Sequence, residues 1–599
     1  MNILGISAFY HDSAACLLRD GEIVAAAQEE RFTRVRHDPR FPENAIAFCL
    51  KQGGIKAENL NYVSFYDKPF LTFDRLLMTC LTTAPQGLRT WLAAMPKWLG
   101  QNLHMPRFIK KKLGYKGPVL FTEHHEAHAA SAFYPSPFDS AAILTMDGVG
   151  EWATASYGFG KGREISLLKE LHFPHSLGLL FSAFTYFTGF RVNSGEYKLM
   201  GLAPYGEPKY KNLILTQLMD LKDDGSLRLN MDYFDFLAGT RMTGRKFSQL
   251  FGGPPRKPET EITRREMDIA ASIQAVTEEV VLKMAAHVYR ETRERNLCMA
   301  GGVALNCVAN SKILSQGRFK NIWIQPAAGD AGGALGAAMA VWHRVCRKDR
   351  STSAWKGPFL GPEYSNDEIR QFLEKGNCPY HKCGDVERAW VVARHIARGK
   401  IVGYLVGPME FGPRALGARS ILGDPRNPQT QITINQKVKF RESFRPFAPA
   451  VLEEKAAEYF DLDRPSPYML LTAPVCKERR LPVPENDSLS MLQRLMQPRS
   501  DIPAVTHLDY SARLQTVSKK DKPDFHALIA EFENHTGCAV IVNTSFNVRG
   551  EPIVCTPQDA YRCFMLTEMD VLVLENNILY KEEQPPYQGK DKATHAPLD

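Results

Sequence analysis

The sequence predicts an α/β protein of two domains, and three observations lead to this prediction. Its 599 residues exceed what one hydrophobic core usually holds, and the length suggests two to four domains. Short apolar strands alternate with helical patterns along most of the chain. A charged stretch with proline and glycine at 347–362 interrupts this pattern, which restarts beyond it. We therefore expect a first domain at 1–346, a linker at 347–362 and a second α/β domain at 363–581.

One layout of strands occurs twice in the first domain. Residues 3–7 are apolar and lead through a loop to a hairpin that turns at Asp20-Gly21. A strand, an acidic glycine turn and a hairpin recur at 143–168. Such a duplication is typical of the actin-like (ASKHA) ATPases, in which a nucleotide binds between two related halves. We therefore predict an actin-like ATPase fold for residues 1–346.

Other segments are assigned from their composition. Residues 66–118 are rich in leucine and aromatic residues, which predicts a helical insert with breaks at Pro85 and Pro96. An apolar face in a large enzyme usually packs on its own protein, so we expect the insert to cover a cleft, while a membrane-surface role stays an alternative. We also expect a helix near 264–295, a polar connection at 477–505 and a disordered tail at 582–599.

The composition argues against several classes of protein. The net charge of +8 is small for this length and suits anionic substrates, but the basic runs are short, so we expect no nucleic-acid partner. The 12 cysteines contain no C-x-x-C pair, which is typical of reduced thiols in the cytoplasm. The first residues lack the pattern of a signal peptide, and no apolar run is long enough to cross a bilayer. We therefore expect a cytoplasmic protein without a membrane partner.

A run of histidines suggests a metal site. His124 and His128 stand four residues apart, so both rings lie on one face of a helix. Asp147 follows a short apolar strand and enters a Gly-x-Gly turn. Two imidazoles and a carboxylate can hold a divalent transition metal with open coordination positions. A structural histidine pair on an ordinary helix is the alternative, and this stretch alone leaves both open.

Glycine turns follow three apolar strands, at 148–150, 301–302 and 329–336. Two of them hold an aspartate, Asp147 or Asp330, and bare backbone N–H groups in such turns can bind phosphate. His11 lies in the first loop and is a candidate general base, with a polar loop role as the alternative. The predicted nucleotide contacts are Gly148, Gly150, Lys198, Gly301, Gly302 and Asn306.

The second domain concentrates cations and strand-end polar groups. Arginine presents a planar fork to phosphate oxygens and lysine presents a point charge, while hydroxyl and amide groups complete an anion pocket. This combination predicts a site for a small, doubly charged anion. The residues of this kind are Arg414, Arg419, Lys437, Lys439, Arg441, Arg445, Arg513, Asn543, Thr544, Ser545 and Asn547, some of which we expect to be solvated.

Taken together, the motifs resemble those of the O-carbamoyltransferases of the NodU/CmcH family. They cover residues 3–565, in the order of the family, and their combination is highly specific. The motifs are E-H-H-E-A-H-A, D-G-V-G-E-W, N-S-G-E-Y-K-L-M-G-L-A-P-Y-G, M-A-G-G-V-A-L-N-C-V-A-N, P-A-A-G-D-A-G-G-A-L-G, M-E-F-G-P-R-A-L-G, R-E-S-F-R-P-F-A-P and N-T-S-F-N-V-R-G-E-P-I-V.

The resemblance implies a two-domain enzyme with a C-terminal YrdC-like domain. That domain would use carbamoyl phosphate and ATP, with Mg²⁺ as a further cofactor left open, to make carbamoyl-adenylate. The N-terminal domain would hold the adenylate on a metal, usually iron as Fe²⁺, and transfer the carbamoyl group to a hydroxyl of a small natural-product acceptor. The acceptor itself and the oligomeric state, for which a homodimer is one option, stay open.

Residue roles carry over by position. His124, His128, Asp147 and Asp330 match the metal ligands of the family, and His11 matches the base. The carbamoyl-phosphate pocket matches Lys439, Arg445, Arg513 and Ser545, with Arg414 as a neighbour. One departure is Pro408, where many relatives have a polar or basic residue, and it puts one contact of the second domain in doubt.

Three other functions are weighed against this one. Threonylcarbamoylation of tRNA uses both half-folds, but the chain lacks a concentrated basic surface. A hydrogenase-maturation carbamoyltransferase would carry zinc-finger C-x-x-C pairs, which are missing. A non-catalytic nucleotide-binding scaffold would not need His11 and the metal-ligand residues, all of which are present.

Overall fold

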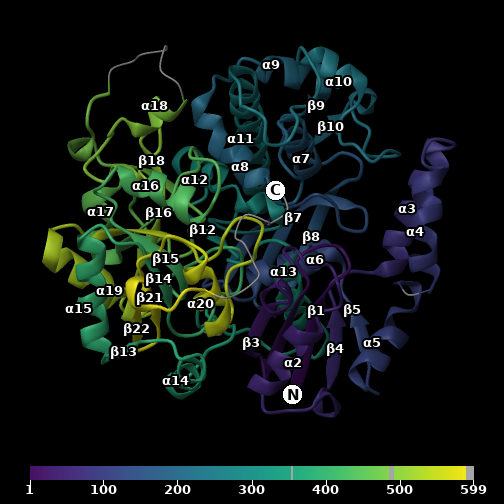
Figure 1. Ribbon diagram of the computed structural model, residues 1–599. Coiled ribbons are helices and arrows are strands. Elements are labelled where there is room, and N and C mark those ends of the chain that lie inside the picture. Colours follow the sequence, from purple (N-terminus) through teal and green to yellow (C-terminus); the bar gives the residue numbers. More distant parts are fainter. Residues whose placement is uncertain (101, 353–354, 484–490, 588–599) are drawn as a thin grey trace. The chain divides into compact units, whose positions relative to one another are not determined.

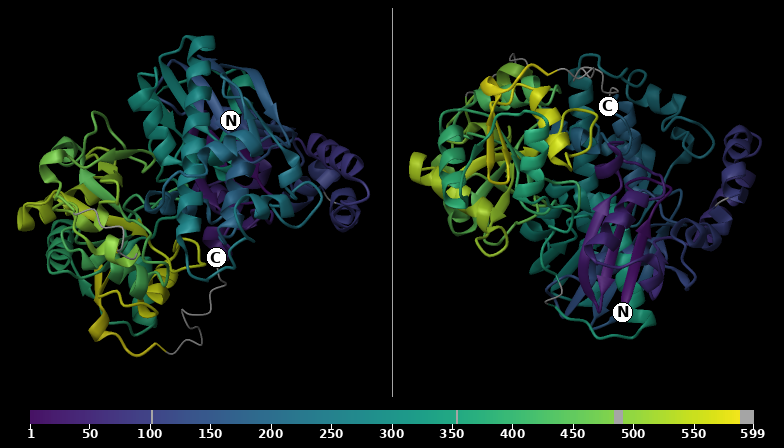
Figure 2. Two further views of the ribbon diagram at one scale, coloured as in Figure 1. Left: turned by 90° about the horizontal axis from the view of Figure 1, so that it is seen from above. Right: turned by 60° about the horizontal axis from the view of Figure 1, so that its bottom comes forward.

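The computed structural model describes residues 1–100, 102–352, 355–483 and 491–587, and the chain forms two compact units (Figures 1 and 2). Unit 1 contains Met1–Glu29 and His37–Trp355. Unit 2 contains Glu30–Arg36 together with the chain from Lys356 onward. A short piece of the N-terminal sequence therefore belongs to the second unit.

Unit 1 contains two five-stranded sheets with the same topology. The first has the order β3-β2-β1-β4-β5 and the second β8-β7-β6-β11-β12. In both, the first three strands form an antiparallel meander and the last two add in parallel. The predicted duplication and the actin-like fold are thereby confirmed. The strands are β1 (Asn2–Ser7), β2 (Ala14–Arg19), β3 (Glu22–Gln28), β4 (Tyr62–Phe65), β5 (Val119–Phe121), β6 (Ser140–Met146), β7 (Ala153–Lys161), β8 (Glu164–His172), β11 (Asn296–Ala300) and β12 (Asn321–Ile324).

A helix of small residues packs closely in unit 1. Helix α13 (Asp330–Ala340) is fully buried, and it touches both α6 (His124–Phe133) and β1. A Cβ atom added to Gly336 would lie 1.8 Å from the Ala127 carbonyl oxygen of α6. A Cβ on Gly5 of β1 would lie 1.9 Å from the Ala334 oxygen of α13. The glycines at 332–336 thus belong to a helix and permit close packing, whereas the sequence suggested a phosphate-binding turn there.

The predicted insert at 66–118 is helical. It contains α3 (Pro69–Thr83), α4 (Leu88–Gly100) and α5 (Met105–Leu113). Pro85 lies between α3 and α4 as expected, but Pro96 lies inside α4. A proline removes one helical hydrogen bond without ending the helix when its neighbours hold the rest of the turn. Helix α11 (Arg264–Thr292) matches the helix expected near 264–295.

Unit 2 is built on a mixed sheet of eight strands in the order β13-β22-β21-β14-β15-β20-β16-β19. Helices α15 (Asp385–Ala397) and α19 (Pro523–Thr536) contact each other, and their apolar faces share one core with the sheet. The strands are β13 (His381–Lys382), β14 (Val402–Leu405), β15 (Arg419–Gly423), β16 (Ala448–Leu452), β19 (Gln515–Val517), β20 (Val540–Ser545), β21 (Val571–Leu574) and β22 (Asn577–Tyr580).

The structure describes only parts of the predicted connection at 477–505 and of the predicted tail at 582–599. The connection at 477–505 contains a short helix, α18 (Met491–Met496), which the sequence did not predict. Most of the expected tail, residues 588–599, lies outside the described residues, and Lys581–Glu583 form a 3₁₀ turn. In the part of the chain that the structure describes, no helix combines the length and apolar character needed to span a bilayer.

Candidate metal centre and anion pocket

The start of α6 is fixed by a buried carboxylate. Both oxygens of Glu151 accept hydrogen bonds from the backbone N–H of His124, at 3.0 and 3.1 Å, and one also accepts from Lys68 N–H. A carboxylate at a helix N-terminus satisfies free donors and interacts favourably with the helix dipole. No pattern in the sequence predicts this contact. It holds the first turn of α6, so that the rings of His124 and His128 share the face predicted by their spacing.

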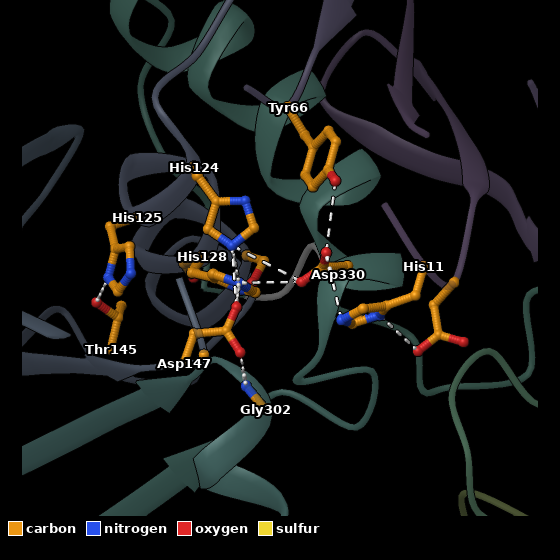
Figure 3. A network of polar contacts seen from close by, with 12 residues as sticks. His11, Tyr66, His124, His125, His128, Thr145, Asp147, Gly302 and Asp330 are labelled. Atoms are coloured by element: carbon orange, nitrogen blue, oxygen red, sulfur yellow. Dashed lines mark hydrogen bonds and ion pairs between the residues drawn. The ribbon is translucent and has the colours of Figure 1, made fainter. Parts of the chain in front are cut away.

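Four side chains converge beside this helix (Figure 3). His124 Nε2 and His128 Nε2 lie 3.0 Å apart, and they are 3.0 and 3.3 Å from Asp147 Oδ2. Asp330 Oδ1 lies 3.7 and 3.8 Å from the same two nitrogens. One ligand atom from each residue lies within 4.8 Å of all the others, and all four residues are buried. The structure therefore brings together the complete predicted set, including Asp330, which arrives on the N-terminus of α13.

The donor set fits a divalent transition metal. Two imidazole nitrogens and two carboxylates are ligands that such ions accept. Asp330 Oδ1 is buried and has no hydrogen-bond partner among the described residues, and an unneutralised buried carboxylate is costly. Burial opposes ionisation of Asp147, but hydrogen bonds and charge from His124 and His128 outweigh it and hold the pKa of Asp147 well below its usual range. These residues could hold a divalent metal.

Backbone glycines support Asp147. The N–H of Gly302 donates to Asp147 Oδ1 at 3.0 Å. Gly301 has φ +93°, and an added Cβ would lie 2.2 Å from the Met146 oxygen, so only glycine fits there. The N–H of Gly301 donates to the Ala328 carbonyl at 2.7 Å. This glycine turn thus orients a carboxylate, whereas the sequence suggested that its N–H groups would bind phosphate.

The other glycine turn has a similar role. The N–H of Gly150 donates to the Ala153 carbonyl at 2.8 Å, which closes the turn between β6 and β7. An added Cβ on Gly150 would lie 2.8 Å from His124 Cβ, so the glycine leaves room for the ligand helix. Gly148 lies in the same turn, directly after Asp147.

Two further predicted nucleotide contacts are buried. Lys198 lies in α8 (Glu196–Leu202) with only 1% of its surface exposed, and its ammonium is 5.6 Å from the centre of the Phe190 ring. It is therefore not an ordinary surface lysine. Asn306 caps α12 (Cys307–Gln316), and its amide exchanges hydrogen bonds with Gln274 at 2.9 and 3.2 Å. The amide of Asn306 thus has a structural role in the fold.

His11 lies at the edge of the metal-binding cluster. Its Nε2 is 3.9 Å from Asp330 Oδ2, and its Nδ1 is 3.3 Å from Asp12 Oδ2. Asp12 Oδ1 also lies 2.7 Å from His37 Nδ1, a partner that sequence reasoning missed. Burial lowers the pKa of His11, but the charges of Asp330 and Asp12 outweigh it and raise that pKa to about 10. With these carboxylates uncompensated, the ring is therefore protonated at neutral pH.

In unit 2, Lys439 is the centre of the predicted anion pocket. It is 2% exposed, and its ammonium contacts the backbone oxygen of Ser545, Ser545 Oγ at 3.1 Å and Asn547 Oδ1 at 2.7 Å. Burial, with the nearby charges of Arg441 and Arg445, places the pKa of Lys439 well below its usual value. A buried cation in the company of other cations is the environment that an anion stabilises.

The remaining residues of the predicted anion pocket differ in burial and in their partners. Arg445 is buried and adjoins Glu442 at 3.6 Å, whereas Arg414 and Arg513 are half-buried. The amide nitrogen of Asn543 donates to Gln515 and Ala415, so this side chain supports the sheet.

Side chains alternate along β20, which places Thr544 on the face opposite to Asn543 and Ser545. Among the polar residues at the end of this strand, Ser545 and Asn547 accept hydrogen bonds from Lys439.

The segment Glu30–Arg36 adds residues that sequence reasoning missed. Arg34 donates to the carbonyls of Pro552 and Ile553, both at 2.7 Å, and Arg31 donates to Gly412 at 2.8 Å. Arg36 is close enough to Lys439 to contribute to lowering its pKa. The only signal in the sequence was a run of three arginines, in R-F-T-R-V-R, directly after a predicted hairpin.

Comparisons with known proteins identify the family to which the chain is similar. A family model described as the carbamoyltransferase N-terminus matches residues 2–339, and one described as the carbamoyltransferase C-terminus matches residues 393–581. An uncharacterized protein of Synechocystis sp. is 58% identical over 99% of this chain and 98% of its own length. The nodulation protein NolNO of Sinorhizobium fredii is 34% identical over 96% of this chain and 80% of its own length.

Among solved structures, component A of the (R)-2-hydroxyglutaryl-CoA dehydratase of Acidaminococcus fermentans matches 58% of this chain and 99% of its own. The identity is 16% and the TM-score 0.33. HypF of T. kodakarensis matches 56% of this chain and 47% of its own, at 15% identity and a TM-score of 0.30.

The duplicated sheets and the matching family models define an α/β transferase with a separate C-terminal unit. The chain belongs to the carbamoyltransferase family. The family predicted from the motifs is confirmed, and so is the prediction of a transferase.

Proposed function

We propose that this protein is an ATP-dependent O-carbamoyltransferase with two active sites, one in each unit. The observation that carries the proposal is the convergence of His124, His128, Asp147 and Asp330 in unit 1. The cationic pocket around Lys439 in unit 2 supports the division of labour. The proposed substrates are carbamoyl phosphate, ATP and a hydroxyl-bearing small molecule.

The first stage is proposed for unit 2. The phosphate of carbamoyl phosphate would lie against Lys439, Arg445, Arg513 and Ser545, whose charges stabilise phosphate as it leaves. Water then replaces phosphate on the carbamoyl carbon, which gives carbamate. A carbamate oxygen attacks the α-phosphorus of ATP, pyrophosphate leaves and carbamoyl-adenylate forms. The buried position of Lys439 limits competing reactions with bulk water.

The second stage is proposed for unit 1. An acceptor hydroxyl attacks the carbamoyl carbon and AMP leaves, while His11 takes the hydroxyl proton. A divalent metal, which we propose to be Fe²⁺, would supply Lewis-acid charge for the AMP phosphate when held by the two histidines and two aspartates. Because Asp330 and Asp12 keep His11 protonated, His11 becomes a base only where the carboxylate charge is offset.

One pair of variants separates the two stages. In His124→Ala, we expect loss of bound metal and of carbamoyl transfer, with pyrophosphate release from ATP and carbamoyl phosphate retained. In Ser545→Ala and Arg513→Ala, we expect pyrophosphate release itself to fall. Metal is measured by elemental analysis of protein purified without oxygen, and transfer by mass spectrometry of carbamoylated hydroxyl compounds. Full turnover in metal-free His124→Ala, or normal adenylate formation in both unit 2 variants, would refute the assignment.

A further inference from the structure

The helical insert of unit 1 exposes an unusual amount of apolar surface. Among the described residues, seven of the seventeen exposed large apolar side chains lie between Phe70 and Leu99. Phe70, Leu81 and Leu92 are each more than 60% exposed. Clusters of this kind on a protein surface mark sites of interaction. The full set is Phe70, Leu71, Met78, Leu81, Leu88, Leu92 and Leu99.

These side chains form one stripe on each helix. Met78 and Leu81 are three residues apart on α3, and Leu88, Leu92 and Leu99 are spaced by four and seven on α4. Such spacings place side chains on a single helix face. Helices α3 and α4 form a helical hairpin whose interior is also apolar. Phe73 of α3 packs there against Trp91 and Trp98 of α4, at ring distances of 6.0 and 6.1 Å. The exposed stripes are therefore additional to the packed interior of the hairpin.

Asp74 and Arg75 of α3 help to attach the helical hairpin of α3 and α4 to unit 1. The indole of Trp152 donates to Asp74, and the guanidinium of Arg75 lies 5.3 Å from the centre of the Phe173 ring. In all three views, α3 and α4 lie at the margin of unit 1 (Figures 1 and 2). The stripes beyond these anchors face away from the core.

The insert is strongly basic as well as apolar. Residues 69–116 contain eight lysines or arginines and one acidic residue, Asp74, and thus carry a formal charge of +7. The chain as a whole carries +8. Nearly all of the excess positive charge of the protein therefore lies in this insert. Arg107 and Lys111 on α5 are exposed, while Met105 and Ile109 bury the other face of that helix.

We propose that the insert at 69–116 is a docking surface for an anionic lipid bilayer. Exposed leucines and phenylalanine enter the interfacial region of the membrane, and exposed cations of the insert such as Arg107 and Lys111 contact acidic headgroups. No described helix is suited to span a bilayer, so the insert lies on the surface of the membrane. A second copy of the chain is the less favourable occupant, because a symmetric pairing would place two inserts of +7 against each other. This proposal replaces the expectation of no membrane partner and is independent of the proposed function.

The test is co-sedimentation of the full chain with sucrose-loaded vesicles. Vesicles of phosphatidylcholine alone are compared with vesicles of phosphatidylcholine and phosphatidylglycerol. We expect binding to the anionic vesicles that falls with added salt, and little binding to the neutral ones. Leu81→Glu with Leu92→Glu, and separately Arg107→Glu with Lys111→Glu, should each weaken binding at least roughly tenfold.

Matched controls lie on exposed positions of unit 2. Val386→Glu on α15 and Lys375→Glu on α14 (Asn366–Lys375) make the same kinds of change outside the insert and should leave binding unchanged. Thermal melting checks that each variant is folded. If the leucine variants do not fold, the charge variants decide the outcome. Equal binding to both vesicle types, or equal loss in the controls, would overturn the proposal. So would a dimer of the unmodified protein that the leucine variants convert to monomers, since a second copy would then cover the stripe.

Discussion

At the scale of single residues, Lys439 shows how burial prepares a group for a ligand. Its pKa is lowered by burial and by the charges of Arg441 and Arg445, so the free protein holds less than a full proton there above that pKa. A bound phosphate would favour the ammonium form. Phosphate binding should therefore take up a proton, in an amount that rises with pH towards the lysine's ordinary pKa.

Calorimetry in buffers of different ionisation enthalpy measures this proton uptake. We expect Lys439→Met to remove the uptake and to weaken phosphate binding by at least about tenfold. Lys437→Met is the matched control, because Lys437 lies two residues away, is exposed and pairs with Glu568 at 2.9 Å. An unchanged proton count in Lys439→Met would show that another group titrates.

The lowered pKa of Lys439 also makes the stability of the protein depend on pH. The unfolded chain binds a proton at Lys439 up to its ordinary pKa, whereas the folded chain releases it at lower pH. In that window the unfolded state binds more protons, so the free energy of unfolding contributed by this group rises with pH. Urea unfolding across pH should show this slope in the unmodified protein and a smaller one in Lys439→Met. An identical slope in both would contradict the lowered pKa.

Some residue roles followed from the sequence and others did not. The spacing of His124 and His128 fixed their common face, because helical periodicity is local. The glycine turns were found, but the partners of their N–H groups depend on backbone pairing across the fold, as with Gly302 and Asp147. Arg36 was missed for the same reason, since its proximity to Lys439 joins residues more than 400 positions apart.

At the scale of elements, α13 decides whether the candidate metal centre is complete. Asp330 reaches the histidines because α13 packs on α6 with no side chain at Gly336. Gly336→Ala should lower the free energy of unfolding by about 1–3 kcal/mol or more, since the new methyl meets backbone and not a flexible side chain. Urea denaturation measures this change.

Gly329→Ala is the control for α13, because nothing lies within 4 Å of a Cβ added there. It precedes the same helix and should change stability by much less. If both variants lose the same amount, tight packing at Gly336 is not what positions the helix. The partner of α13, helix α6, lies about 200 residues earlier in the chain and was not foreseeable from local pattern.

At the scale of the whole molecule, a piece of the N-terminal sequence completes unit 2. Arg34 holds the carbonyls of Pro552 and Ile553, and the neighbouring Glu551 carbonyl accepts from Asn547, which in turn contacts Lys439. Arg34→Ala should therefore lower phosphate affinity and cost about 1.5–3 kcal/mol of stability, the range for charged hydrogen bonds.

Arg318→Ala in unit 1 is the control for Arg34→Ala, because that arginine is exposed. Phosphate titration and urea unfolding of the full chain measure both effects. Normal phosphate affinity in a destabilised Arg34→Ala protein would limit Arg34 to a structural role.

Because each unit has its own candidate site, each ligand should stabilise the protein through different residues. A ligand that binds only the folded state adds roughly 4 kcal/mol at a thousand times its dissociation constant, so Fe²⁺ and phosphate should each raise the melting temperature. Asp330→Asn should abolish the shift caused by Fe²⁺ and keep the one caused by phosphate, because its buried Oδ1 belongs to the cluster in unit 1. Ser545→Ala should do the reverse. Scanning calorimetry without oxygen provides the measurement, and an Fe²⁺ shift that survives Asp330→Asn would place the metal elsewhere in the chain.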